Sequence, residues 1–259
     1  MIRTIDLALM ILMLGAASTS TYAQKSADDP LAELQKLYAP KSHDERLAEA
    51  QQRAAIKEAT LGPDNDDTLY AQWSVANLLR RKCRDQEAAV LEGRIHPKLL
   101  PRRAEGLMRH AEKVESRGGT PTGDLTEAGD VLVKLERLSD ARRAYDRAIA
   151  GLEKSYRENH TRTPLEKSLQ YATAKAGIAE VNRLEGRFVE AEQGYRDAIA
   201  IFDEFNRPDK LPRPFPVAWL DSLEMIYRAR HLEQQADAIR QRAASRHAQL
   251  ERARGCKKH

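Results

Sequence analysis

Aromatic residues and strand-forming runs are scarce in this sequence. Of its 259 residues, 5% are Phe, Trp or Tyr, whereas 32% are charged. Stretches of Val, Ile, Thr and Tyr are nearly absent, and Ala, Leu, Glu and Arg, which lose little conformational freedom in a helix, are prominent. The composition therefore predicts an all-α fold, in which helices approach one another over small side chains.

Cysteine is also scarce. The sequence contains two, Cys83 and Cys256, which lie far apart along the chain. In an oxidising compartment they could bridge each other, link to another chain or stay as thiols. Sequence alone does not show whether two distant cysteines meet, so these alternatives stay open.

Long hydrophobic runs are confined to the first residues. In "MIRTIDLALMILMLGAASTSTYAQ", Arg3 precedes an apolar stretch from Leu7 to about Ala17, and small and polar residues follow. The stretch is shorter than the roughly 20 residues of a membrane-spanning helix, which disfavours a membrane anchor. We predict a signal peptide at 1–23, cleaved after Ala23, and a periplasmic or secreted protein without stable membrane insertion.

The motifs of common catalytic and metal sites are missing. The seven histidines form no His-Glu-x-x-His pair, and the sequence has no Cys-x-x-Cys, no Gly-x-Ser-x-Gly, no phosphate-binding loop and no dinucleotide fingerprint. Most carboxylates lie three or four residues from Arg or Lys, which is the spacing of surface ion pairs on helices. We therefore predict no enzyme activity, no catalytic residue, no metal and no cofactor.

Charge of one sign does not gather in a long block. The chain has 43 basic and 39 acidic residues, a net charge of +4 and a pI near 9.0. The two signs are interleaved, whereas recognition of nucleic-acid phosphates needs clustered cations. A nucleic-acid partner is not expected.

What the sequence does contain is a repeat. The segments "RLSDARRAYDRAIAGLE" (137–153) and "LEGRFVEAEQGYRDAIAIF" (184–202) share the same steps. In the second, Ala191 and Ala198 lie two helical turns apart on one face, with Tyr195 between them. Small residues let a partner helix come close, and the ring fills the space beside them. We interpret these residues as packing determinants of stacked helix pairs.

Two further segments, 68–95 and 217–244, each read as helix, turn and helix. The segments "ATLGPDNDDTLYAQWSVANLLRRK" (59–82) and "LEGRFVEAEQGYRDAIAIF" (184–202) resemble the tetratricopeptide repeat (TPR) family, in particular its kinesin-light-chain-like variety with long repeats, in an exported bacterial form. The resemblance implies a TPR-like α-solenoid of antiparallel helix pairs. Glu136 replaces the family's turn glycine in the second repeat, and Glu92 and Arg240 replace its aromatic residue in the first and fourth.

The predicted organisation follows from the repeat and its flanks. We expect a signal peptide at 1–23, a linker with a short helix at 24–44, a helical solenoid at 45–254 and a basic tail at 255–259. The solenoid would hold about four helix pairs, with an extra helix near 101–117.

In the family that the chain resembles, the first helix of each pair lines a groove that holds a ligand. Matched residue by residue, the groove would present Tyr70, Trp73, Asn77, Arg80, Glu180, Arg183, Glu224 and Arg228. The Asn77 amide suits a peptide backbone, the Arg80 guanidinium suits a carboxylate, and Trp73 could serve as an aromatic anchor. Val133 interrupts the row of arginines in the second repeat.

A plainer interpretation of the same residues stays open. Glu180–Arg183 and Glu224–Arg228 could be ordinary intrahelical ion pairs, and Tyr70 and Trp73 could belong to the core.

We predict a non-catalytic scaffold of the bacterial envelope that binds a protein or peptide of unknown identity. One alternative is an envelope enzyme, or an enzyme subunit, with a site built from scattered Glu and His residues. A second alternative is a binder of an anionic polymer or nucleic acid that uses the arginine row.

Overall fold

The computed structural model describes residues 42–159, 168–205 and 216–254. The chain divides into two compact units, Met1–Ser42 and His43–His259, and only the second is described beyond a single residue. The predicted signal peptide, most of the segment predicted as linker and short helix, and the basic tail lie outside the described residues.

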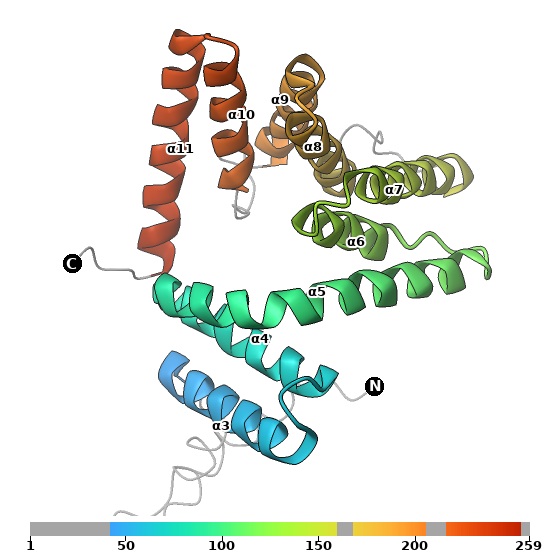
Figure 1. Cartoon of the computed structure of the whole chain (residues 1–259). Helices are drawn as coiled ribbons and strands as arrows, with labels where there is room; N and C mark the ends of the chain where they lie inside the picture. Colours follow the sequence, from blue (N-terminus) through green and yellow to red (C-terminus); the bar gives the residue numbers. More distant parts are fainter. Residues whose placement is uncertain (1–41, 160–167, 206–215, 255–259) are drawn as a thin grey trace, which may run out of the picture. The chain divides into compact units, whose positions relative to one another are not determined.

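The described residues form helices and no strand, which confirms the predicted all-α class. The helices are α3 (His43–Leu61), α4 (Asp66–Arg81), α5 (Asp85–Glu115), α6 (Thr122–Lys134), α7 (Leu138–Asn159), α8 (Leu169–Leu184), α9 (Phe188–Phe205), α10 (Val217–Ala229) and α11 (Glu233–Arg254). Each packs against the next in chain order (Figure 1). The pairs α4–α5, α6–α7, α8–α9 and α10–α11 repeat along the chain, as in an α-solenoid.

Four turns of the same backbone form connect the two helices of these pairs. In the third pair, the Gly186 N–H donates to the Arg183 carbonyl at 3.1 Å and the Arg187 N–H to the Asn182 carbonyl at 2.8 Å. These bonds close the end of α8 around a residue with left-handed backbone. The other three turns repeat both bonds. The left-handed residues are Cys83 (φ 61°), Glu136 (φ 57°), Gly186 (φ 76°) and His231 (φ 57°).

Because the turns are equivalent, they align the four pairs residue by residue. Five positions after each left-handed residue stands an alanine with no exposed surface: Ala88, Ala141, Ala191 and Ala236. Tyr145 and Tyr195 occupy the next equivalent core position and are 1% and 2% exposed. The prediction that Ala191, Ala198 and Tyr195 are packing determinants is confirmed, since all three are buried.

Neighbouring pairs share their hydrophobic cores. One cluster joins Leu100 of α5, Tyr145 of α7 and Val181 of α8. The approach is close enough that a Cβ at Gly177 of α8 would lie 2.3 Å from Cε1 of Tyr145, and one at Gly129 of α6 would lie 2.5 Å from the same atom. The Tyr145 ring therefore fills a notch between two glycines, and each pair covers the apolar face of the next.

The extra helix predicted at 101–117 is wrong as a separate element, because it is the second half of α5. This helix runs through Pro97 and Pro101 for 31 residues. Proline removes one backbone hydrogen bond within a helix. Gly93, whose carbonyl loses the N–H of Pro97, is exposed, so water can take over that bond. Buried residues on both sides of the prolines hold α5 as one helix, with Ile95 packed against α4 and Ala104 against α6 and α7.

The cysteine of the first turn is disulfide-bonded, so a free thiol at Cys83 is excluded among the alternatives left open. The other cysteine of the sequence, Cys256, lies outside the described residues. No helix in the described ranges is long and apolar enough to cross a bilayer.

Candidate functional site

The predicted aromatic anchor lies on α4. Trp73 is half-buried and meets the exposed Tyr70 edge to face, with 6.4 Å between ring centroids. The guanidinium carbon of Arg103, from α5, lies 4.5 Å from the Trp73 ring centroid, within cation–π range. Arg103 also pairs with Glu127 of α6. An intramolecular cation therefore already covers part of this indole.

Asn77 and Arg80 lie on the same helix. The Asn77 side chain is exposed. Arg80 donates from Nε and Nη2 to the two carboxylate oxygens of Glu92, at 2.9 Å and 2.5 Å. The hydrogen bond from Arg80 holds the pKa of Glu92 below its usual value. Glu92 thus occupies the Arg80 guanidinium, which was predicted to bind a carboxylate of the ligand.

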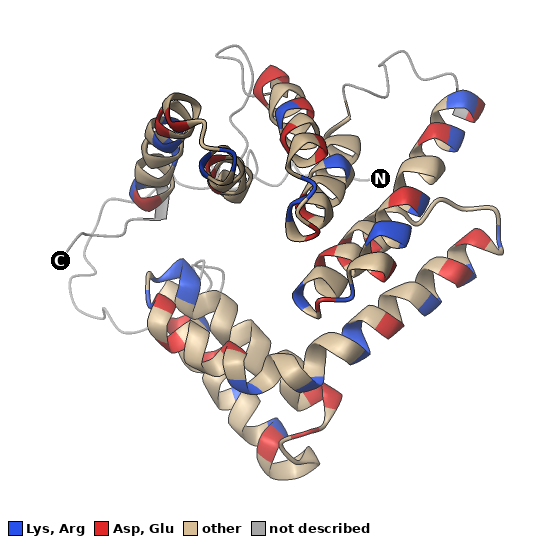
Figure 2. Ribbon diagram, turned by 45° about the horizontal axis from the view of Figure 1, so that its top comes forward, with Lys and Arg blue, Asp and Glu red and all other residues tan. Residues whose placement is uncertain are grey.

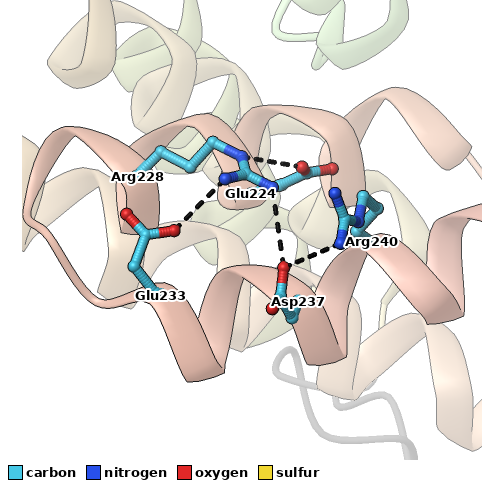
Figure 3. Close-up of polar contacts among 5 residues, drawn as sticks. All are labelled: Glu224, Arg228, Glu233, Asp237 and Arg240. Atoms are coloured by element: carbon cyan, nitrogen blue, oxygen red, sulfur yellow. Dashed lines mark hydrogen bonds and ion pairs between the residues drawn. The ribbon is translucent and has the colours of Figure 1, made fainter.

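The fourth pair places its predicted residues in a surface ion-pair cluster (Figure 3). Arg228 donates from Nε to Glu224 at 3.0 Å and from Nη1 to Glu233 at 3.2 Å. Its Nη2 lies 3.7 Å from Asp237, which also accepts a hydrogen bond from Arg240 at 2.9 Å. The Glu224–Arg228 contact is the intrahelical pair of the plainer interpretation.

The arginine row is therefore balanced by carboxylates from within the chain. Arg80, Arg183 and Arg228 hold equivalent turn positions, since the carbonyl oxygen of each accepts the N–H of the left-handed residue. Each of the three has a carboxylate partner. Figure 2 shows the same interleaving of basic and acidic residues along the helices. The row is not a free basic stripe.

A pocket of about 400 Å³ opens where the first helices of three successive pairs meet. Helices α6, α8 and α10 contribute most of its walls, and the rings of Tyr145 and Tyr195 reach it from α7 and α9. On α8 the pocket is lined by the small residues Ala176 and Gly177, and on α10 by the aromatic ring of Trp219. The place is where the resemblance puts a ligand, although most of the predicted residues lie elsewhere.

Glu180 is the predicted site residue that lines this pocket. It accepts two hydrogen bonds from Arg183, at 2.8 Å and 2.6 Å, one from the Tyr195 hydroxyl, and one from the Ser222 hydroxyl at 3.3 Å. Burial raises the pKa of Glu180, but the hydrogen bonds from Arg183 and Tyr195 outweigh it and bring the pKa below its usual value. Glu180 is a fully partnered carboxylate.

Asp130 is the equivalent carboxylate of the preceding pair. The Tyr145 hydroxyl donates to its Oδ1 at 2.6 Å, and both tyrosines lie fifteen residues after their carboxylates. Among the described residues, Asp130 has no ion-pair partner. Asp130 is exposed and lines the pocket. Desolvation by neighbouring protein atoms raises the pKa of Asp130, against the lowering effects of the hydrogen bond from Tyr145 and of the Lys134 charge.

A larger cavity of about 610 Å³ lies along α8 and α9. Four of its five charged lining residues are paired with one another, since Lys175 donates to Asp197 at 3.0 Å and Arg230 pairs with Glu192. A charged ligand would have to displace these contacts. We therefore regard the pocket of α6, α8 and α10 as the stronger candidate.

Residues that the sequence reasoning missed supply most of this pocket's polar groups: Asp130, Lys134, Ser222 and the two tyrosine hydroxyls. Tyr145 and Tyr195 had been recognised for packing alone. A signal was available, because a carboxylate precedes each tyrosine by the same fifteen residues.

The pocket's chemistry is that of hydrogen bonding and charge pairing. Burial raises the pKa of both Tyr145 and Tyr195, so their hydroxyls stay protonated as donors. Within the described ranges, no three His, Cys, Asp or Glu side chains come together in a way that could hold a metal ion.

Comparison with known proteins gives likeness at the level of structure. No family model and no curated protein matches the chain. Among solved structures, it is similar to a kinesin light chain protein of Podosopora anserina with nearly identical TPR-like repeats, at 17% identity over 86% of this chain and 94% of that one. Two crystal structures of that protein give TM-scores of 0.39 and 0.38.

The chain is also similar to BtubC (BKLC) of P. vanneervenii, at 15% identity over 82% of this chain and 93% of that one, with a TM-score of 0.32. The Podosopora anserina protein has TPR-like repeats, the type that the sequence resembles.

Proposed function

We propose that this protein is a non-catalytic scaffold that binds an extended peptide segment of a partner protein in the pocket of α6, α8 and α10. The observation that carries the proposal is the pocket itself, formed by the first helices of three successive pairs. Its polar groups are held in place before a ligand arrives, because two buried tyrosines orient the carboxylates. Such preorganisation reduces the entropic cost of binding.

The mixed lining suits a peptide. Apolar contact is available from Val133, Ala176 and Trp219, while Thr173 and Ser222 contribute hydroxyl groups. Concave sites that bind with specificity combine such apolar walls with a few placed polar groups. The small side chain of Ala176 leaves room for the backbone of a bound peptide to approach α8.

We extend the proposal to the bacterial envelope because of the N-terminal segment. Export would remove residues 1–23 and bring the protein to the periplasm or beyond. Sequencing the N-terminus of the protein recovered from cells tests this. A mature chain that begins at Gln24 supports export, and a chain that retains Met1 contradicts it.

The two tryptophans of the chain allow a direct test of the binding surface, because each stands in one of the two regions considered. Trp219 lines the pocket, and Trp73 belongs to the surface of Tyr70, Asn77 and Arg80. The probe is a peptide selected from a phage-displayed library of random linear peptides. In Trp73→Phe, which keeps Trp219, the peptide should shift the emission; in Trp219→Phe it should bind without changing the emission of Trp73.

A shift confined to Trp73 would overturn the pocket assignment. The double variant Asn77→Ala with Arg80→Ala provides the matched test of the first pair. Unchanged peptide affinity would place Asn77 and Arg80 outside the binding surface, and a loss of about tenfold or more would bring them into it.

A further inference from the structure

We infer that the pocket receives one basic side chain, arginine or lysine, from the bound segment, and that this cation pairs with Asp130. The ligand would thus supply the charge that Arg183 supplies in the next repeat. The inference rests on the proposed function and deepens it, because it states which peptides the pocket selects.

The turn geometry establishes which residues correspond. The Glu136 N–H donates to the Val133 carbonyl at 3.0 Å, as the Gly186 N–H donates to the Arg183 carbonyl at 3.1 Å. Val133 therefore stands where Arg183 stands. Asp130 lies three residues before Val133 on α6, and Glu180 lies three residues before Arg183 on α8. Each of these two carboxylates accepts a hydrogen bond from a tyrosine hydroxyl.

The second repeat thus keeps the carboxylate and loses its arginine. Glu180 accepts the two-pronged contact of Arg183, whereas Asp130 accepts a hydrogen bond from Tyr145 and has no cation partner in the described ranges. Asp130 is exposed at the pocket and has no ion-pair partner among the described residues, so a ligand cation can reach it. An arriving cation gains a charge-assisted hydrogen bond.

The other charged groups of the pocket fit a single cation. Its charged lining residues are Asp130, Lys134 and Glu180. The charge of Glu180 is balanced by Arg183. Lys134 follows Asp130 by one helical turn on α6, is exposed, and makes no ion pair with a described residue. Its ammonium disfavours a second basic residue in the ligand and would accept an acidic or polar neighbour.

The apolar walls also suit a guanidinium. Trp219 is held edge-on against Phe202, with 5.7 Å between ring centroids, and lines the pocket together with Asp130. Guanidinium groups stack on aromatic faces and donate to carboxylates in their own plane. Arginine is therefore expected to bind more tightly than lysine.

The experiment compares two peptides that differ in charge alone. The probes are acetylated and amidated Ser-Ala-Arg-Ala-Ser and the same peptide with citrulline, which is nearly isosteric and neutral, in place of arginine. Each is titrated into the full-length 15N-labelled protein to about 10 mM and followed by NMR, a range that reaches millimolar dissociation constants. The arginine peptide should shift the amides around Asp130 and bind about tenfold more tightly than the citrulline peptide.

Three variants place the cation. Asp130→Asn, which keeps an acceptor for the Tyr145 hydroxyl, should bring the two peptides to equal affinity. Val133→Arg introduces an arginine at the position that Arg183 holds in the next repeat. This arginine should pair with Asp130 and so also bring the two peptides to equal affinity. Lys134→Gln should strengthen binding of the arginine peptide about twofold, because a repelling charge is removed. Thermal unfolding of each variant shows whether it folds.

The outcomes separate this inference from the proposed function. Equal affinities of the two peptides for the wild-type pocket, or an arginine preference that survives in Asp130→Asn, would overturn the cation assignment and leave a peptide-binding pocket. No shift around the pocket with either probe would overturn the cation assignment. If the library-selected peptide also leaves the Trp219 emission unchanged, the proposed function fails with it.

Discussion

The second and third helix pairs share a backbone plan and differ in how they treat one carboxylate. Tyr145 and Tyr195 lie at the same position, both buried, and each donates to a carboxylate fifteen residues earlier. In the third pair, Arg183 balances that carboxylate. In the second, Val133 takes the place of the arginine, and Asp130 lines the pocket without an ion-pair partner among the described residues.

The difference teaches how a repeat acquires a binding role without a change of fold. The backbone turn, the buried alanine and the tyrosine keep the packing, while a single surface-facing position decides whether the carboxylate is satisfied within the chain. Glu180 serves the structure, and Asp130 is left available to a ligand. Stability and binding should therefore separate cleanly between the two repeats.

The largest expected effect removes what the two repeats share. Tyr145→Ala and Tyr195→Ala should each lower the free energy of unfolding by about 3–5 kcal/mol, since each deletes a buried ring and leaves a cavity. Urea denaturation followed by circular dichroism measures this. Tyr70→Ala serves as the control, because Tyr70 is 37% exposed and should cost under about 1 kcal/mol. Equal losses in all three would contradict the shared packing role.

The next effect distinguishes the two carboxylates. Glu180→Gln removes the charge that Arg183 and Tyr195 bond and should lower the free energy of unfolding by about 2–3 kcal/mol at neutral pH. Asp130→Asn keeps the acceptor for Tyr145 and removes an exposed charge that makes no ion pair with a described residue, so it should change stability by less than about 0.5 kcal/mol or raise it. A larger loss of stability in Asp130→Asn than in Glu180→Gln would contradict the proposed difference between the two repeats.

The pH dependence should also have opposite signs. The folded pKa of Glu180 lies below its ordinary 4.5, so its stabilising contribution is present above that value and is lost as the pH falls through the folded pKa. The folded pKa of Asp130 lies above its ordinary value of 3.8. Wild type therefore loses stability relative to Asp130→Asn as the pH rises from 3.8 through the folded pKa of Asp130.

Urea denaturation of wild type, Glu180→Gln and Asp130→Asn between about pH 3 and pH 7 measures both contributions. The difference in free energy of unfolding between wild type and Glu180→Gln should become smaller as the pH falls. Over the same range, the free energy of unfolding of wild type should rise relative to that of Asp130→Asn. Parallel curves for the two variants would contradict the difference between the repeats.

The smallest effect concerns the turns. Glu136 has the left-handed backbone that Gly186 adopts in the third pair. Glycine takes this conformation without the steric penalty of a side chain. Glu136→Gly should raise the free energy of unfolding by about 0.5–1 kcal/mol, and Gly186→Ala should lower it by a similar amount. Urea denaturation measures both, and changes of the same sign in the two variants would show that the turns are not equivalent.

Much of the fold was predictable from spacing. The alanines and the tyrosine in 184–202 predicted a helix packed against its own kind, and Ala191, Ala198 and Tyr195 are buried as that pattern requires. The four turns also lie where short breaks in the helical pattern indicated them. These features are local and periodic, which is why sequence reveals them.

The length of α5 was not predictable in the same way. Pro97 and Pro101 indicate a break, because a proline within a helix removes a backbone bond. Burial of residues before and after them, such as Ile95 and Ala104, outweighs that local preference. This is a tertiary effect, and sequence periodicity does not contain it.

The composition of the candidate pocket was not predictable from the sequence. The resemblance indicated the first helices, and the pocket lies on three of them. It also indicated Arg80 and Arg228 as ligand-facing, whereas both are occupied by carboxylates of their own pair. Whether a guanidinium is free depends on contacts across the turn, and these need coordinates. The assignment of Tyr70, Trp73 and Asn77 to a binding surface stays a prediction.

The most direct measurement is a carbon-detected NMR titration of the Asp130 and Glu180 carboxyl groups in the full-length protein. If one repeat satisfies its carboxylate and the other leaves it for a ligand, the pKa of Asp130 should lie above 3.8 and that of Glu180 below 4.5. A pKa for Asp130 at or below 3.8 would mean that the Tyr145 hydrogen bond and nearby positive charge already outweigh desolvation, and the distinction between the two repeats would be lost.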